Sequence, residues 1–125
     1  MADPLQIELV AADRVVWSGQ ASEVLARTVE GDLGVLADHA PLLSLLVPSV
    51  VVITPLEGEM VHAAISEGFI SVANNRVSSL SEDAFLADEI DAAAAQSELE
   101  AAQESDDAEA ILRAEAKLQV IDKAS

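Results

Sequence analysis

The sequence contains no cysteine and no tyrosine, and its only aromatic residues are one tryptophan and two phenylalanines. Without cysteine the chain has no disulfide bonds, no thiolate metal ligands and no thiol nucleophile. Its two histidines, His39 and His62, are separated by strand-rich sequence, and no glycine-rich stretch has the Lys and Ser/Thr of a Walker phosphate loop. Because nucleophile, base and metal-ligand sets are all missing, we expect a non-catalytic protein with no bound metal.

Basic residues are also scarce. The 125 residues include 6 Lys and Arg against 23 Asp and Glu, which gives a net charge of -17. Such a chain repels nucleic-acid phosphates and anionic lipid headgroups, so we expect basic protein surfaces as partners and no nucleic acid. Residues 85–125 carry 11 of the acidic residues in a third of the length.

No apolar run is long enough to cross a bilayer. The longest candidate, residues 42–53, spans 12 residues and contains Pro48 and two serines. The first four residues, MADP, show neither the basic nor the apolar region of a secretory signal. We therefore expect no direct membrane insertion, and attachment to any membrane through another protein.

The first two-thirds of the chain has the pattern of short β-strands. Leu5, Ile7 and Leu9 alternate with polar residues, which is the period of a half-buried strand. Asn74-Asn75 suits a tight hairpin turn, because asparagine tolerates positive φ. Strands are predicted over residues 5–9, 15–17, 24–28, 50–54, 60–65, 69–72 and 77–80. Many short strands at this spacing predict a β-sandwich or barrel.

The remainder predicts two helices. From Asp88 onward the chain contains no glycine and no proline. Asp88 is the expected N-cap of a helix over 88–104, and Asp106 with Glu109 fits a capping box for a second helix over 107–121. Two helices joined by a few polar residues form an αα-hairpin.

The predicted inner stripe of the first helix is Ile90, Ala94, Ser97 and Ala101. These mostly small side chains bury little apolar area, at about 25 cal/mol per Å². The carboxylates of the hairpin also repel one another. We therefore expect a marginally stable hairpin that moves between packed and extended states.

One stretch resembles a known family. Residues 31–46 read GDLGVLADHAPLLSLL and are similar to the pattern G-E-x-G-I-L-P-x-H-x-P-L-x-x-x-L of the epsilon subunit of bacterial F-type ATP synthases. The matching positions are Gly31, Gly34, His39, Pro41 and Leu42. Asp32 replaces the usual Glu and keeps its charge, and Ala37 stands where Pro is common.

Four further segments resemble the family in the same order along the chain. They are the strand end at Trp17-Ser18-Gly19, the segments 67–72 and 75–80, and the helix start at 89–91. In the segment 67–72, Glu67 stands where the family pattern has glycine. The ending LQVID is also similar to that of the family.

This resemblance implies a fold, partners and a place. The fold is a β-sandwich of about ten strands in residues 1–84, followed by a helical hairpin in residues 85–125. The implied partners are the gamma subunit, the c-subunit ring and, through the hairpin, the catalytic alpha/beta head. The implied role is coupling of proton flow to ATP synthesis, with possible inhibition of ATP hydrolysis by the hairpin, at the cytoplasmic face of the bacterial cell membrane as a peripheral subunit.

The resemblance also implies site residues. The expected interface with gamma and the c-ring consists of Gly31, Asp32, Leu33, Gly34, His39 and Pro41. From the residues themselves, the two glycines predict tight turns with positive φ, and His39 predicts a structural hydrogen bond. Arg113 and Lys117 lie one helical turn apart and form the compact basic patch expected to contact the head if the hairpin inhibits.

ATP is not an expected cofactor. Some family members bind ATP through the motif I-D-x-x-R-A, and here Ile90 and Asp91 are followed by Ala94 at the arginine position. A triphosphate needs concentrated positive charge, which this acidic hairpin lacks. An alternative to the rotor subunit remains open from composition: an acidic β-sandwich adaptor that binds a basic protein.

Overall fold

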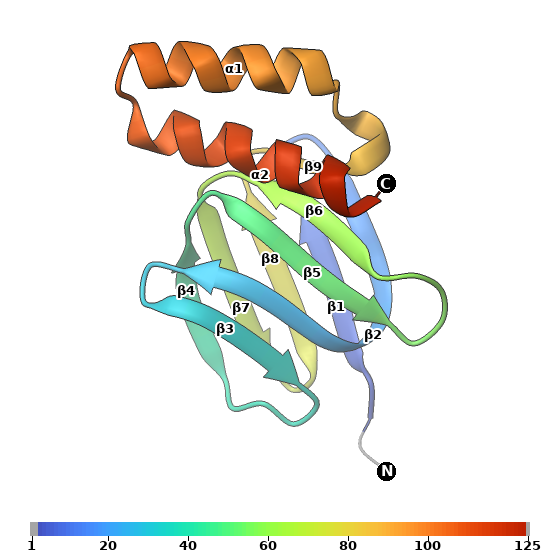
Figure 1. Ribbon diagram of the computed structural model, residues 1–125. Coiled ribbons are helices and arrows are strands. Elements are labelled where there is room, and N and C mark those ends of the chain that lie inside the picture. The colour runs from blue at the N-terminus through green and yellow to red at the C-terminus, as the bar shows by residue number, and fades with distance from the viewer. Residues whose placement is uncertain (1–2, 125) are drawn as a thin grey trace.

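The computed structural model describes residues 3–124 and shows a β-sandwich with a helical hairpin against one end (Figure 1). Met1, Ala2 and Ser125, at the outer ends of the two expected domains, lie outside the described residues. The described strands are β1 (Leu5–Val10), β2 (Val15–Thr28), β3 (Gly31–Leu36), β4 (Leu42–Leu46), β5 (Ser49–Pro55), β6 (Val61–Ile65), β7 (Gly68–Ala73), β8 (Arg76–Ser81) and β9 (Ala84–Leu86). A 3₁₀ turn (Ala87–Glu89) leads to α1 (Ala92–Glu104) and α2 (Ala108–Ala124).

The long strand β2 joins the two layers of the sandwich. Its first half pairs with β1, and its second half pairs with β3 and β5. One layer continues from β1 through β8 and β7 to β4, with β1 and β8 parallel. The other continues from β5 through β6 to β9. The predicted sandwich followed by a helical hairpin is confirmed, with nine strands in the described residues where about ten were expected.

The core lies between the layers. Leu5, Ile7 and Leu9 of β1 are buried while Gln6 and Glu8 are exposed, which confirms the predicted alternation. Each such large apolar side chain contributes about 1.5–3 kcal/mol when it is fully buried. The other large, fully buried side chains of the sandwich core are Val24, Val35, Val51, Ile53, Ile65, Ile70, Val72 and Val77.

The prediction of two separate strands on either side of Gly19 was wrong, because β2 runs unbroken through it. The ring of Trp17 covers this glycine, and a Cβ at Gly19 would lie 3.0 Å from the ring. Trp17 itself is half-buried and packs against the core. The glycine therefore makes room for an aromatic ring within the strand.

Gly31 and Gly34, the two glycines of the family-like stretch, have different backbone conformations. Gly31 has φ +123° at the β2–β3 turn, as predicted, but Gly34 lies inside β3 without positive φ, so the turn predicted there was wrong. Asn74 and Asn75 have φ of 52° and 61° and form the predicted turn between β7 and β8.

The first long helix begins later than predicted. Ala87–Glu89 forms a 3₁₀ turn, Ile90 is extended, and Asp91 is the N-cap, so the predicted cap at Asp88 was wrong. The Asp91 carboxylate accepts hydrogen bonds from the amides of Ala93 and Ala94 at 2.9 and 3.1 Å. In α2 the cap is also later than predicted, at Asp107 in place of Asp106, since Asp107 accepts from the amide of Ala110 at 3.1 Å.

The inner face of α1 also differs from the predicted stripe. Ala95 and Ala102 are buried, whereas Ala94 and Ala101 are exposed. A helix built from alanine, serine and glutamate has little contrast between its faces, so packing against α2 selects the face. α2 in turn packs on the outer face of β5 and β6, and α1 lies outermost (Figure 1).

Candidate functional site

The predicted rotor-interface residues lie along one edge strand. Gly31 and Asp32 stand at the β2–β3 turn, and His39 and Pro41 follow the other end of β3. At about 3.3 Å per residue, the two ends of β3 are roughly 16 Å apart. The structure therefore distributes these residues along an edge, with Leu33 and Gly34 between them.

Asp32 already has a partner within the chain. Its Oδ1 accepts a hydrogen bond from Nε of Arg27 at 2.9 Å, and the two side chains are 79% and 60% exposed. Such an exposed pair contributes about 0–1 kcal/mol and exchanges readily with other partners. The Asp32 carboxylate is therefore held in position at the surface and remains accessible to a partner protein.

The loop after β3 is tied to the β7–β8 turn. Asp38, with φ 65°, donates its amide to the Asn75 side-chain oxygen at 2.6 Å, and the Asn75 amide group donates to the Asp38 carboxylate at 3.3 Å. The ring Nδ1 of His39 lies 2.7 Å from the carbonyl oxygen of Ala40. The loop carrying His39 and Pro41 is thus ordered by its contact with the β7–β8 turn, a segment far away in sequence.

A group of large apolar side chains is exposed on the layer formed by β4, β7 and β8. Leu45 pairs with Phe69, and Phe69 pairs with Leu80, so these three form a row across the strands. With Leu43 and Val29 they form what we call the outer apolar face, in which Leu43 and Leu45 are 70% and 60% exposed. A cavity of about 450 Å³ lies over part of it. Sequence analysis did not predict this face, although the unalternating run LLSLL of β4 was a signal for it.

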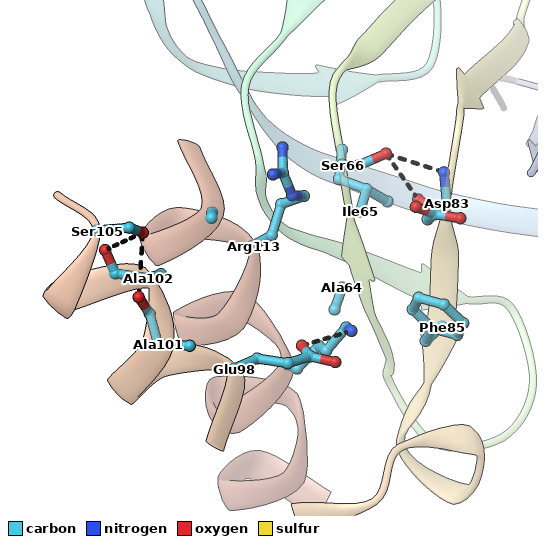
Figure 2. Close-up of a pocket in the computed structure, with 12 residues that line it drawn as sticks. Ala64, Ile65, Ser66, Asp83, Phe85, Glu98, Ala101, Ala102, Ser105 and Arg113 are labelled. Atoms are coloured by element: carbon cyan, nitrogen blue, oxygen red, sulfur yellow. Dashed lines mark hydrogen bonds and ion pairs between the residues drawn. The ribbon is translucent and has the colours of Figure 1, made fainter. Parts of the chain in front are cut away.

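A cavity that is open to solvent lies between the hairpin and the sandwich. Figure 2 shows this cavity, of about 440 Å³, with Arg113 and Glu98 on the hairpin side and Ala64, Ile65 and Phe85 on the sandwich side. Lys117 also lines it. The structure therefore brings the two predicted basic residues together, facing the sandwich.

Arg113 connects α2 to the sandwich. Its Nη1 donates to the carboxylate of Glu67, in the β6–β7 turn, at 2.8 Å, and Glu109 lies 3.9 Å away on the same helix. The hydrogen bond that Arg113 donates to Glu67 raises the pKa of Arg113 above its ordinary value, and partial burial opposes this only in part. The guanidinium is therefore charged at all physiological pH values.

Lys117 connects the two helices. Its Nζ donates to Glu98 of α1 at 2.9 Å and lies 5.0 Å from the centroid of the Phe85 ring on β9. The ammonium thus has both a carboxylate and an aromatic face as partners. In this conformation neither predicted inhibitory residue is free of contacts.

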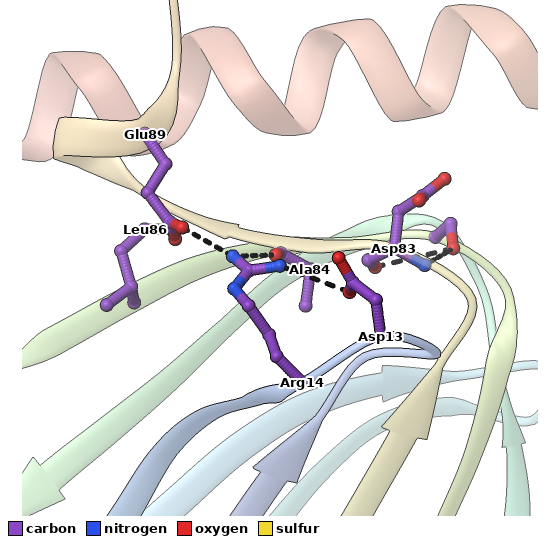
Figure 3. A network of polar contacts seen from close by, with 7 residues as sticks. Asp13, Arg14, Asp83, Ala84, Leu86 and Glu89 are labelled. Atoms are coloured by element: carbon purple, nitrogen blue, oxygen red, sulfur yellow. Dashed lines mark hydrogen bonds and ion pairs between the residues drawn. The ribbon is translucent and has the colours of Figure 1, made fainter.

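The segment leading into the hairpin is fastened by Arg14, in the β1–β2 turn (Figure 3). Its Nη2 donates to the carbonyl oxygen of Ala84 at 3.1 Å and to the Glu89 carboxylate at 2.5 Å. Glu89 also accepts the amide of Leu86 at 3.0 Å. Arg14 and Glu89 therefore hold the 3₁₀ turn against the sandwich.

The residues of the ATP motif line a smaller cavity of about 200 Å³. Ile90, Asp91 and Ala94 are on its wall, together with Glu98 and Lys117. Among residues 3–124, no three His, Asp or Glu side chains gather as metal ligands. Within the same residues no helix is long and apolar enough to cross a membrane.

Comparisons with known proteins agree with this architecture. Residues 4–87 match the family model described as ATP synthase, Delta/Epsilon chain, beta-sandwich domain. The ATP synthase epsilon chain of Streptomyces avermitilis is 52% identical over 121 residues, covering 97% of this chain and 98% of the relative. That of Corynebacterium glutamicum is 44% identical, covering 97% and 95%.

Two solved structures have the same fold. A chain of the Euglena gracilis mitochondrial ATP synthase, in a structure of OSCP, F1 and c-ring, matches with a TM-score of 0.72 and 25% identity over 95% of this chain and 78% of that one. A chain of the Tetrahymena thermophila central stalk and c-ring matches with a TM-score of 0.59 and 18% identity over 70% of each, which bears on the fold alone.

The β-sandwich followed by a helical hairpin, which the Euglena chain matches over 95% of this chain, defines the class as an ATP synthase subunit of this fold. The chain belongs to the ATP synthase delta/epsilon family, among the epsilon chains. Its function is that of a non-catalytic subunit of the ATP synthase complex.

Proposed function

We propose that the chain works in the central rotor at the cytoplasmic face of a bacterial membrane, where it couples proton flow to ATP synthesis. The outer apolar face carries this proposal. A continuous group of five large exposed side chains is uncommon on a monomer and marks a protein interface. Since the chain belongs to a rotary complex, we assign this face to the gamma subunit.

The edge formed by β3 and the following loop is the proposed contact with the c-ring. Asp32 supplies a carboxylate that can exchange Arg27 for an arginine or lysine of the ring. His39 and Pro41 stand in a loop that is already ordered through Asp38 and Asn75, which lowers the entropy cost of docking.

The hairpin is the proposed regulator of ATP hydrolysis. Arg113 and Lys117 are its adjacent cations and would contact acidic surfaces of the catalytic head once they leave their present partners. We propose no tight ATP site on the hairpin, because Ala94 replaces the arginine of the motif and Asp91 uses its carboxylate to cap α1. Saturable binding of ATP in calorimetry would contradict this.

The gamma assignment is tested by disrupting the outer apolar face. Phe69→Ser should abolish co-purification with the gamma subunit, whereas Met60→Ser, at an exposed apolar residue on the β5–β6 turn, should leave it intact. Equal retention of gamma by both variants would contradict the assignment. Thermal unfolding of each variant controls for loss of fold.

Regulation is tested with the matching catalytic head. Full-length chain should slow ATP hydrolysis, and a chain ending at Ile90, which keeps the Arg14–Glu89 contact, should bind without slowing it. If both bind and neither slows hydrolysis, the hairpin has no inhibitory role. If neither binds, the rotor assignment itself fails.

A further inference from the structure

The hairpin is held by two ion pairs that act at different joints. Arg113 pairs with Glu67 and thereby joins α2 to the sandwich. Lys117 pairs with Glu98 and thereby joins α2 to α1. The two adjacent cations of α2 therefore connect it to two separate bodies, and each pair can be removed without touching the other.

Apolar contact between the hairpin and the sandwich is small. The buried cluster at this joint consists of Ala64, Ala116 and Val120, with Val50 and Ile90 at its margin. On one side of α2 lies the cavity of Figure 2, and on the other a groove of about 440 Å³ extends between α2 and β2, β3 and β5. Because so little apolar area is buried, an ion pair is a larger share of the attraction at this joint than it would be in the sandwich core.

Glu67 is well placed to receive Arg113. The carbonyl oxygen of Glu67 accepts the amide of Glu82 at 3.2 Å, and the neighbouring Ser66 exchanges hydrogen bonds with Asp83 through both its amide and its hydroxyl. The turn that carries Glu67 is thus fixed before the hairpin docks, so pairing costs little backbone entropy.

We propose that Glu67 is a latch that holds the hairpin on the sandwich, whereas Glu98 holds the two helices together. While the latch is closed, Arg113 is paired with Glu67, and with the more distant Glu109, and is unavailable to an acidic partner. Any acidic surface that takes Arg113 must displace Glu67, and the release of the hairpin is therefore competitive and sensitive to salt.

The latch can be measured in the isolated full-length chain, which has no native cysteine to interfere with labelling. Spin labels at Ser22→Cys and Gln103→Cys report the distance between sandwich and hairpin. Labels at Gln96→Cys and Gln119→Cys report the distance between α1 and α2. All four positions are exposed.

Glu67→Gln should lower the ratio of docked to undocked hairpin by about fivefold and leave the distance between α1 and α2 unchanged. Glu98→Gln should broaden the distance between the helices. Glu57→Gln, on the exposed β5–β6 turn, is the matched control and should change neither distance. Added salt should undock the native chain but have a smaller effect on Glu67→Gln.

The exchanged pair Glu67→Arg with Arg113→Glu should restore docking that each single substitution loses. Indistinguishable sandwich–hairpin distances in Glu67→Gln and Glu57→Gln would overturn the proposal, as would failure of the exchanged pair in chains whose sandwich melts normally. The latch rests on the proposed function in one respect, its effect on ATP hydrolysis. If the released hairpin inhibits the catalytic head, the Glu67→Gln chain should inhibit hydrolysis more strongly than the native chain. Normal latching in the isolated chain without this effect would refute the regulatory role and leave the latch standing.

Discussion

Gly68, at the start of β7, occupies the tightest backbone position among the described glycines. A Cβ added there would lie 1.9 Å from the carbonyl oxygen of Leu80 and 2.7 Å from the Cα of Ser81. Both atoms belong to the backbone of β8, which cannot rotate away. At Gly34 the nearest atom is a flexible Leu25 methyl at 3.4 Å.

Gly68→Ala should therefore lower the free energy of unfolding by about 2–3 kcal/mol, since β7 and β8 must separate to admit the methyl group. Gly34→Ala should change it by no more than about 1 kcal/mol, and in the stabilising direction. Urea unfolding of both variants checks the difference. Equal stabilities would show that β7 and β8 can separate at Gly68 with little loss of free energy, which would contradict the prediction.

Asp32 illustrates a residue whose importance should be functional and not structural. Because its pair with Arg27 is exposed, Asp32→Asn should change stability by less than about 0.5 kcal/mol. If the carboxylate meets the c-ring, the same variant should reduce ATP-driven proton pumping in reconstituted enzyme, while Glu57→Gln should not. Unchanged pumping in both would remove Asp32 from the interface.

At the scale of elements, α1 depends strongly on its cap. The helix contributes two buried alanines, and its first free amides are satisfied by Asp91. Sequence analysis predicted a cap at Asp88, since both aspartates precede an alanine-rich run. Arg14 pairs with Glu89 in the 3₁₀ turn, and this turn ends before Asp91, so the α-helix begins after Asp91 and not after Asp88.

Asp91→Ala should destabilise α1 by about 1 kcal/mol, because two amides lose their acceptor. Asp88→Ala, on an exposed residue of the same segment, should have little effect. Amide hydrogen exchange of α1 is the measurement: faster exchange in Asp91→Ala alone supports the observed cap. Faster exchange in Asp88→Ala alone would favour the cap that the sequence predicted.

At the scale of the whole molecule, the sandwich and the hairpin differ in how much apolar core each contains. The sandwich has a continuous core between two layers, whereas the hairpin adds a few small side chains and two ion pairs. α1 has 13 residues, close to the length of about 12–15 residues below which isolated helices are marginal in water without tertiary packing. We therefore propose that the fold divides after Ile90, with the sandwich as the stable body.

A chain ending at Ile90 should unfold cooperatively with nearly the thermal midpoint of the full chain. A peptide of residues 88–125 should show much lower helicity than the same residues in the intact protein. Circular dichroism measures both. A shortened chain that fails to fold would show that the hairpin is part of the core.

Local patterns were sufficient for much of the fold and for the family. The alternation of β1, the asparagine turn and the alanine-rich end each follow from interactions between near neighbours in the chain. The ordered motifs indicated an epsilon chain, and the sequence relatives confirm it. The basic pair at Arg113 and Lys117 also follows directly from helical spacing.

Long-range packing was needed for the rest. The buried face of α1, the outer apolar face and the partners of Arg113 and Lys117 all depend on residues brought together from distant parts of the chain. An alanine-rich helix has faces of similar polarity, so its sequence does not show which face packs inward. The partner of a charged residue likewise cannot be identified until the fold places the two charges side by side. The role of Glu67 could not be read from its position in sequence, because its partner lies 46 residues away on another element.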